Sequence, residues 1–103
     1  MTLGQTQEKF SRMIPALLNK AFELGFEVRI GHVLRCDHCP VGKEFSLHKM
    51  KLAIDLNLFK DGKFLSGTAD HTPLGEYWES LGGSWGGRFN DGNHYSLSFK
   101  GMK

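Results

Sequence analysis

The chain has 103 residues, a hydrophobic content of 40% and a formal net charge of +2. This length and composition are typical of one globular domain with a single core, so we expect one domain over residues 1–103. Basic residues are spread along the chain, which argues against nucleic acid as the partner. No stretch approaches the roughly 18 apolar residues of a membrane span, and the first twenty residues do not resemble a secretory leader. We therefore expect synthesis and folding in a cytoplasm, without membrane contact.

The first predicted element is an amphipathic helix over residues 2–24. Its apolar residues recur every three or four positions, Thr2 with Gln5 matches a capping box, and Gly25 is a natural stop. Pro15 predicts a kink or a later start. The apolar face is expected to comprise Phe10, Ile14, Leu17, Leu18, Ala21, Phe22 and Leu24.

Two strands are predicted next. Residues 26–35 alternate apolar and polar side chains, which indicates a half-buried strand, and residues 36–44 form an aperiodic loop with Cys, Asp, Pro and Gly. Residues 52–59 are almost continuously apolar, which favours a central strand covered on both faces. Asp61-Gly62 then supplies a tight turn.

The last part of the chain predicts a short helix and a final strand. Thr72 is expected to cap the helix and Pro73 to start it, Gly82-Gly83 to end it, and residues 94–99 to form the strand. Its apolar positions are Leu74, Tyr77, Trp78 and Leu81. The order of elements indicates an α+β fold, a small and mainly antiparallel sheet flanked by helices.

Asp55 lies in the middle of the apolar segment 52–59. An ionised carboxylate there costs several kcal/mol unless a positive group holds it. His48 precedes it by seven positions, and His94 follows Asp91 by three. Imidazole nitrogens and a carboxylate are ligands of a catalytic zinc that keeps one position for water. If the last strand pairs beside the central one, His94 can reach a metal held by His48 and Asp55.

Two further side chains suit hydrolysis of a carbonyl compound. Asp91, on a turn, can take a proton from the attacking water, and the guanidinium of Arg35 suits a substrate carboxylate or an oxyanion. Each residue also has a simpler interpretation. His48 and His94 could be surface or capping histidines, and Asp55 could pair with Arg29 or Arg35. Asp91 could simply form the turn, and Arg35 could be a solvated strand end. One site explains all of them together. His32 and His71 lack such a context and are interpreted as structural.

Two segments carry a resemblance to a known family. Residues 46–59, SLHKMKLAIDLNLF, resemble the Ser-x-His-x-x-Gly-x-Ala-x-Asp signature of zinc D-Ala-D-Ala carboxypeptidases and L-alanyl-D-glutamate endopeptidases. These enzymes cleave peptidoglycan and share a fold with the hedgehog signalling domain. Residues 77–97, YWESLGGSWGGRFNDGNHYSL, resemble the second half of that site in small phage-encoded members. The sequence departs from the family at Lys51, where glycine is common, and after Arg35, where CDHC replaces threonine.

The resemblance assigns a role to each candidate residue. It implies zinc ligands at His48, Asp55 and His94, the catalytic base at Asp91, and substrate contacts at Arg35 and Ser46. It further implies a zinc peptidase domain that hydrolyses stem peptides of peptidoglycan. A short chain without long insertions favours an open cleft and hence an L-Ala–D-Glu endopeptidase, and we expect a monomer. A phage endolysin of this kind stays in the host cytoplasm until lysis and then acts on the periplasmic cell wall.

Several alternatives stay open. The same metal centre serves D-Ala-D-Ala carboxypeptidases, and some relatives are non-catalytic, zinc-containing wall-binding proteins. Cys36-x-x-Cys39 could form a thioredoxin-like redox site, although no amphipathic helix follows it, or a structural zinc knuckle with His38 or His48. Alkylation of the thiols would release zinc from a knuckle and leave it in a peptidase site.

Overall fold

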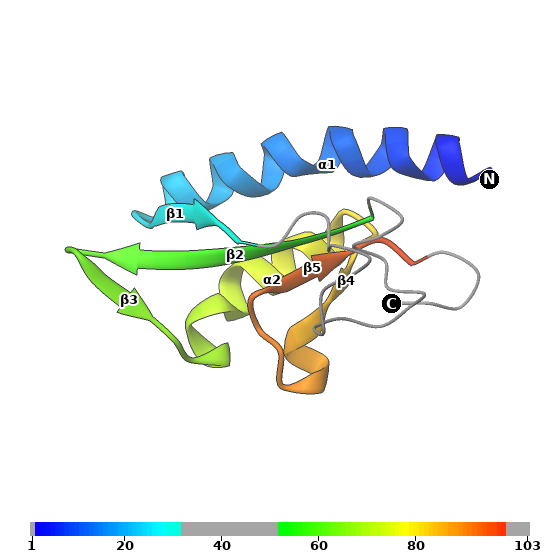
Figure 1. Cartoon of the computed structure of the whole chain (residues 1–103). Helices are drawn as coiled ribbons and strands as arrows, with labels where there is room; N and C mark the ends of the chain where they lie inside the picture. The colour runs from blue at the N-terminus through cyan, green and yellow to red at the C-terminus, as the bar shows by residue number, and fades with distance from the viewer. Residues whose placement is uncertain (1, 32–51, 99–103) are drawn as a thin grey trace, which may run out of the picture.

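The structure of the chain is a computed structural model, and it describes residues 2–31 and 52–98. These residues form two helices and a five-stranded sheet in which every pairing is antiparallel, so the α+β class is confirmed (Figure 1). The elements in order are α1 (Leu3–Glu23), β1 (Glu27–Ile30), β2 (Ala53–Lys60), β3 (Lys63–Leu65), the 3-10 helix η1 (Thr68–His71), α2 (Thr72–Ser80), β4 (Ser84–Trp85), the 3-10 helix η2 (Gly86–Phe89) and β5 (His94–Ser96).

Helix α1 begins where the capping box predicts. The side-chain oxygen of Thr2 accepts the backbone N–H of Gln5 at 3.1 Å, and the Gln5 side chain accepts the backbone N–H of Thr2 at 2.9 Å. The helix continues through Pro15 without a break, so the later start is wrong. Pro15 has no N–H to donate to the carbonyl of Ser11. Both residues are exposed, so water can donate a hydrogen bond to that carbonyl instead.

The buried face of α1 is close to the predicted one. It comprises Thr6, Phe10, Met13, Leu17 and Ala21, with Ile14, Leu18 and Leu24 packed at its border. Phe22, also expected there, is 56% exposed, because it stands one residue beyond Ala21 and a helix turns about 100° per residue. No helix in the described part of the chain combines the length and the apolar character that crossing a membrane requires.

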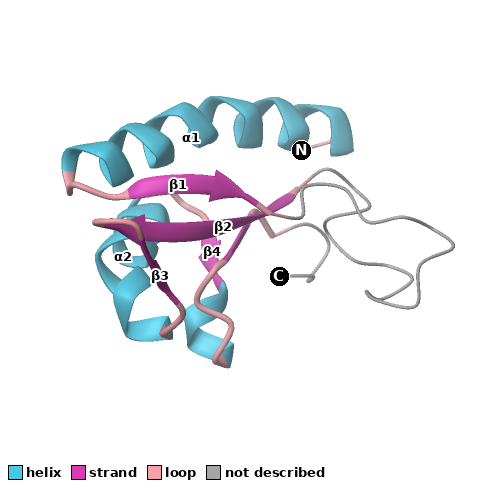
Figure 2. Cartoon of the chain, turned by 60° about the vertical axis from the view of Figure 1, so that its left-hand side comes forward, coloured by secondary structure: helices cyan, strands magenta, loops and turns pink. Residues whose placement is uncertain are grey.

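Strand β2 is central, as predicted. It pairs with β1 on one side and with β5 on the other, and it forms a hairpin with β3. Its two faces differ, so complete cover on both faces is wrong. Leu52, Leu56 and Leu58 are fully buried against the helices, whereas Asp55 and Asn57 are only partly buried on the opposite face. Figure 2 shows α1 above β1 and β2, with β3 and α2 below β2.

The turn between β2 and β3 also follows the prediction. Asp61 and Gly62 both have positive φ angles, 52° and 78°, which is the backbone of a two-residue hairpin turn. The hairpin places Phe64 directly opposite Phe59. Strand β3, which follows the turn, has three residues and was not predicted, because three residues are too few to show an alternating pattern. In β1, Val28 is partly buried but Ile30 is 55% exposed.

Helix α2 begins one residue earlier than predicted. His71 occupies the N-cap position and Thr72 is already helical, because η1 leads directly into the helix. The C-terminus is as expected: Gly82 has a φ of 97°, and the N–H of Gly83 bonds to the carbonyl of Trp78 at 3.0 Å. This is the hydrogen-bond pattern of a Schellman motif.

One core joins both helices to the buried face of the sheet. The ring of Trp78 contacts Phe10 of α1 edge-to-face at 5.8 Å and Tyr95 of β5 at 6.1 Å. The indole N–H of Trp78 donates to the carbonyl of Ser96 at 2.8 Å, so its polar atom is satisfied inside the core. On the opposite face of the sheet, Asp55 and Asn57 are the partly buried polar side chains of β2.

Candidate active site

The sheet brings Asp55 and His94 together although they are 39 positions apart in the sequence. They are direct partners in the ladder between β2 and β5, and His94 Nδ1 lies 3.2 Å from Asp55 Oδ1. Their side chains are 13% and 16% exposed, so solvent reaches both. The strand pairing on which the sequence argument depended is therefore confirmed.

The backbone around this pair is held from both sides. The carbonyl of Asp55 accepts the N–H of Gly31 at 2.8 Å, and the N–H of Leu56 donates to the carbonyl of Asn93 at 2.9 Å. A Cβ at Gly31 would lie 3.3 Å from the Cβ of Asp55, so the strand beside the carboxylate is closely packed. The sheet thus fixes the backbone from which the carboxylate of Asp55 projects.

The two side chains suit a cation. A partly buried carboxylate oxygen beside an imidazole nitrogen provides two of the donors that zinc takes in peptidases. His48, the third expected ligand, lies outside the described residues, as do Arg35 and Ser46. Within residues 2–31 and 52–98, no three His, Cys, Asp or Glu side chains form a group that could hold a metal.

Asp91 lies on the turn that leads into β5. Its N–H donates to the carbonyl of Gly86 at 2.9 Å, and its carbonyl accepts the N–H of His94 at 3.1 Å. Asn90 adopts a left-handed conformation with a φ of 60°, which turns the chain out of η2. Asp91 is therefore exposed to solvent on a segment that is hydrogen-bonded to the backbone of His94.

Trp85 supports this turn, and the sequence argument did not single it out. Its indole N–H donates to the carbonyl of Gly92 at 2.8 Å, and the residue is only 4% exposed. Any Cβ at Gly75 or Gly87 would overlap the indole ring, so both positions require glycine. The available signal was the Trp-Gly-Gly sequence, which places a large ring where backbone must approach closely.

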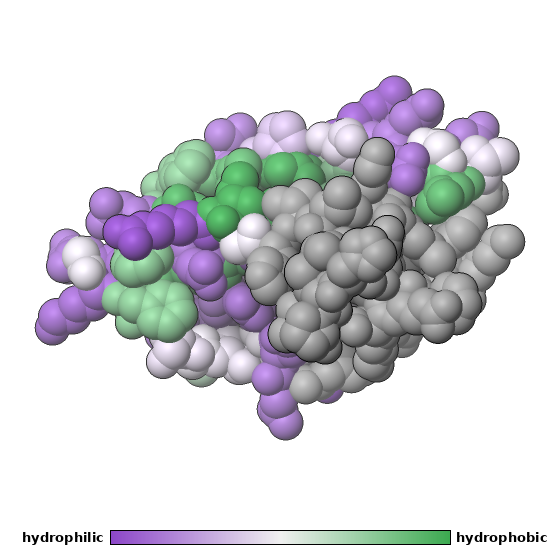
Figure 3. All heavy atoms as spheres, in the orientation of Figure 1, coloured by the Kyte–Doolittle hydropathy of each residue, from purple (hydrophilic) through white to green (hydrophobic). Residues whose placement is uncertain are grey.

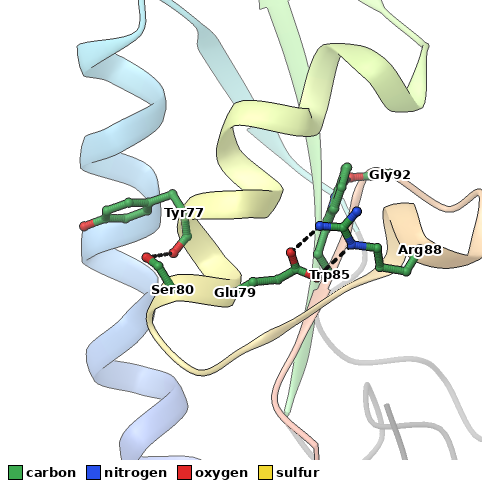
Figure 4. Close-up of polar contacts among 6 residues, drawn as sticks. All are labelled: Tyr77, Glu79, Ser80, Trp85, Arg88 and Gly92. Carbon is green, nitrogen blue, oxygen red and sulfur yellow. Dashed lines mark hydrogen bonds and ion pairs between the residues drawn. The ribbon is translucent and has the colours of Figure 1, made fainter.

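An ion pair joins α2 to the segment that carries Asp91 (Figure 4). Arg88 donates to both carboxylate oxygens of Glu79, at 3.0 and 2.7 Å, and its guanidinium lies 5.3 Å from the ring centre of Trp85. These hydrogen bonds lower the pKa of the Glu79 carboxyl. The pair is solvent-exposed, so its role is to orient Arg88 over Trp85 and not to stabilise the fold strongly.

His71 has the structural role expected of it. It is 3% exposed, and its Nδ1 lies 2.7 Å from the hydroxyl of Tyr95. Burial lowers the pKa of His71, an effect that Asp70 partly opposes, and burial also raises the pKa of Tyr95. A neutral imidazole is thus favoured as the partner of a neutral phenol. The other structural histidine, His32, lies outside the described residues.

A cleft opens beside Asp91. It has a volume of about 280 Å³ and lies between β2, the segment from β3 to η1, and the turn before β5. Side chains from these segments line it, among them Asn57, Phe64, Thr68, His71, Asp91 and Asn93. Asn57 follows Asp55 by two positions and Asn93 directly precedes His94, so the cleft adjoins the Asp55–His94 pair.

The sequence profile of a family described as D-alanyl-D-alanine carboxypeptidase matches residues 41–97, more than half of the chain. The chain belongs to this family. The match includes Ser46, His48, Asp55, Asp91 and His94, whereas Arg35 precedes it. No curated protein matches the sequence.

Membership of the D-alanyl-D-alanine carboxypeptidase family defines the general activity. The chain is a peptidase that acts on peptidoglycan and hence a hydrolase. Peptidases of this family generally depend on zinc. Cys36 and Cys39, which prompted the redox and zinc-knuckle alternatives, lie outside the described residues, so those alternatives stay hypotheses.

Proposed function

We propose that the chain is a zinc-dependent endopeptidase that hydrolyses the L-Ala–D-Glu bond of peptidoglycan stem peptides. The observation that carries the proposal is the pairing of Asp55 with His94 at 3.2 Å, on strands joined in one ladder beside Asp91. His48, Asp55 and His94 would hold the metal. Bound zinc supplies a Lewis acid that polarises the carbonyl and lowers the pKa of water.

The protein's own groups perform the proton transfers. Asp91 accepts a proton from the water that attacks the L-Ala carbonyl and delivers it to the D-Glu nitrogen as the C–N bond breaks. The products are a carboxyl group on L-Ala and a free amine on D-Glu. Arg35 and Ser46 orient the substrate. The hydrogen bond from the N–H of His94 to the Asp91 carbonyl, at 3.1 Å, supports a fixed relation between base and ligand.

The two segments of the site, residues 46–59 and 77–97, are joined without a long insertion, which favours an open cleft and hence an endopeptidase over a carboxypeptidase. A carboxypeptidase must bind the terminal carboxylate of its substrate, for which lysine or arginine is the usual partner. Among the described residues that line the cleft there is neither, and Asp91 contributes a negative charge. The D-Glu of the L-Ala–D-Glu bond also keeps one free carboxylate beside the scissile bond, and Arg35 is the proposed partner of the substrate carboxylate in either case.

The proposed biological setting is that of a phage endolysin. A monomeric enzyme would accumulate in the host cytoplasm and reach the periplasmic wall at lysis. This setting is consistent with a small peptidoglycan-acting peptidase.

The decisive experiment is digestion of Gram-negative peptidoglycan with zinc-loaded protein, followed by mass spectrometry of the products. We expect fragments that end in L-Ala and fragments that begin with D-Glu. Asp91→Asn should lower kcat at least about 100-fold, the lower range for loss of general-base catalysis. Asp61→Asn is the matched control, because Asp61 is also an exposed turn aspartate and asparagine tolerates its φ of 52°.

Each result assigns the activity. Release of D-Ala alone would make the enzyme a carboxypeptidase. No product from a protein that holds one zinc per chain would favour a wall-binding role. Equal loss in Asp91→Asn and Asp61→Asn would remove Asp91 from the mechanism.

A further inference from the structure

The face of the sheet that carries Asp55 continues toward an exposed aromatic surface. Side chains alternate along a strand, so Asp55, Asn57 and Phe59 lie on the same face of β2, and Phe64 joins them from the opposite position on β3. From Asp55 this face extends about 7 Å to Asn57 and about 13 Å to Phe59, at roughly 3.3 Å per residue. It thus leads from the proposed metal ligands into the cleft and to its aromatic border.

The described lining of the cleft combines apolar surface with several polar groups and has little charge. Asn57, Ser66, Thr68 and Asn93 offer amides and hydroxyls that can both donate and accept hydrogen bonds. The described lining contains no lysine or arginine, and the guanidinium of Arg29 is stacked on Phe59, which is not among the lining residues. Such a lining suits a neutral ligand with many hydroxyl and amide groups.

The border of the cleft carries an exposed ring. Phe64 lines the cleft and is 57% exposed. Its ring centre lies 5.4 Å from the ring centre of Phe59. The guanidinium of Arg29 lies on the Phe59 ring, 4.2 Å from its centre. Figure 3 shows apolar surface over β3 with hydrophilic side chains around it. An exposed aromatic ring beside polar groups suits a pyranose, which presents one face of C–H groups and a rim of hydroxyls.

We propose that this cleft, with Phe64 at its border, binds the N-acetylated sugar that carries the stem peptide. This inference rests on the proposed function. In peptidoglycan only the lactyl group and L-Ala separate the sugar from the L-Ala–D-Glu bond, a span of about 7 Å in extended chain. A scissile bond held at Asp55 and His94 therefore brings the lactyl end of the sugar to the level of Asn57, and the sugar then extends toward Phe64. The D-Ala–D-Ala bond, several residues further along the peptide, would not.

Binding is tested first, without any reaction. The probe is the GlcNAc–MurNAc disaccharide whose lactyl carboxyl is capped as the methylamide, titrated into the full chain and followed by amide NMR shifts. We expect shifts at residues 64–68 and 90–93, and binding at least tenfold weaker in Phe64→Ala. Phe22→Ala is the matched control: Phe22 is 56% exposed but lies on α1, and it should bind as the wild type does.

The outcomes of the titration are distinct. Absence of shifts in the wild-type chain at millimolar probe would overturn the proposal, as would equal weakening by Phe64→Ala and Phe22→Ala. Asn93→Ala provides a second variant, because its backbone carbonyl still accepts the N–H of Leu56. It too should weaken binding, and wild-type affinity in both cleft variants would exclude the cleft as the site.

The kinetic test compares two substrates that differ only in the sugar: the disaccharide tripeptide and the free tripeptide. The ratio of their kcat/KM values should fall at least fivefold in Phe64→Ala and keep its wild-type value in Phe22→Ala. An unchanged ratio in Phe64→Ala would overturn the sugar site while leaving the peptidase intact. Cleavage of neither substrate, with binding of the capped disaccharide preserved, would instead overturn the proposed function and keep the sugar site.

Discussion

At the scale of single residues, the buried pair of His71 and Tyr95 shows how the core includes a titratable group next to the site. His71 is only 3% exposed, and its Nδ1 lies 2.7 Å from the phenol oxygen of Tyr95. Burial lowers the pKa of His71 below 6.5, against the smaller effect of Asp70. The neutral form is therefore the one that the fold accommodates.

This lowered pKa predicts a specific dependence of stability on pH. Below about pH 6.5 the unfolded chain binds a proton at His71 before the folded chain does, so the free energy of unfolding falls as the pH falls. Above that value the contribution is fully present. In His71→Gln, which keeps a hydrogen-bonding side chain, this part of the slope should vanish. Urea unfolding between about pH 5 and 8 measures it.

The comparison uses metal-free protein, so that titration of metal ligands is the same in both chains. The difference between wild type and His71→Gln then reports on His71 alone. Parallel curves for the two proteins would show that His71 does not titrate differently in the folded and unfolded chains.

At the scale of elements, the contact between α2 and Trp85 depends on Gly75. Alanine normally stabilises a helix interior by about 1 kcal/mol relative to glycine. Here a Cβ would overlap the indole ring, which must move. We expect Gly75→Ala to reduce the free energy of unfolding by about 1–3 kcal/mol, the range for overpacked cores.

Gly4→Ala is the matched control for this prediction. Gly4 also lies in a helix, and the nearest atom to its added Cβ would be 3.9 Å away, so the change should be neutral or slightly stabilising. Urea unfolding of both variants gives the comparison. Equal changes in the free energy of unfolding at Gly75 and Gly4 would mean that the Trp85 ring can move to make room for the added Cβ.

The hydrogen bond between Trp85 and Gly92 predicts a link between β4 and the turn that holds Asp91. Trp85→Phe keeps most of the ring but leaves the buried carbonyl of Gly92 without this donor, at a cost of about 1–3 kcal/mol. We expect faster hydrogen exchange at the amides of Asp91 and His94, together with a lower kcat. Hydrogen exchange followed by mass spectrometry or NMR measures the first effect.

Trp78→Phe provides the comparison for Trp85→Phe. It removes a hydrogen bond of the same length, from the indole to the carbonyl of Ser96, but on the core side of β5. It should reduce stability without raising exchange at Asp91. The same exchange pattern in both variants would indicate general loosening and not a local link.

The elements that could be predicted from sequence are those with a long or punctuated pattern. Residues 2–24 show the helical period over six turns, and Asp61-Gly62 marks the hairpin, so α1 and the turn of β2–β3 were identified. Strands β3 and β4 have three and two residues, too few for any period. They exist because neighbouring strands offer hydrogen-bonding partners, which is tertiary information.

The residues of the candidate site also differ in how far they could be predicted from the sequence. Asp55 was noticeable because a carboxylate stands in an apolar strand, and His94 because it follows Asp91 at the start of a strand. The contribution of Trp85 could not be predicted, because a buried tryptophan in sequence does not reveal which carbonyl its N–H will meet. The proposed roles of Arg35, Ser46 and His48 stay predictions.

At the scale of the whole molecule, a shared metal would join segments that only the folded chain brings together. Asp55 and His94 are 39 positions apart and meet through the ladder of β2 and β5, so the unfolded chain offers no comparable site. A ligand that binds only the folded state stabilises it by mass action. The free energy of unfolding, measured with and without zinc, therefore reports whether the metal binds to the folded chain.

Zinc at 100 times its Kd adds about 2.7 kcal/mol to the free energy of unfolding, which raises Tm by about 10 °C for a domain of this size. We expect a chelator to lower Tm by that amount in the wild type and to have no effect in Asp55→Asn. Native mass spectrometry should detect one zinc in the wild type. Alkylation of Cys36 and Cys39 should leave that zinc bound, because thiols are not among the proposed ligands. If alkylation releases the metal and Asp55→Asn retains it, the zinc belongs to the cysteine pair, and the pairing of Asp55 with His94 is a hydrogen bond of the sheet.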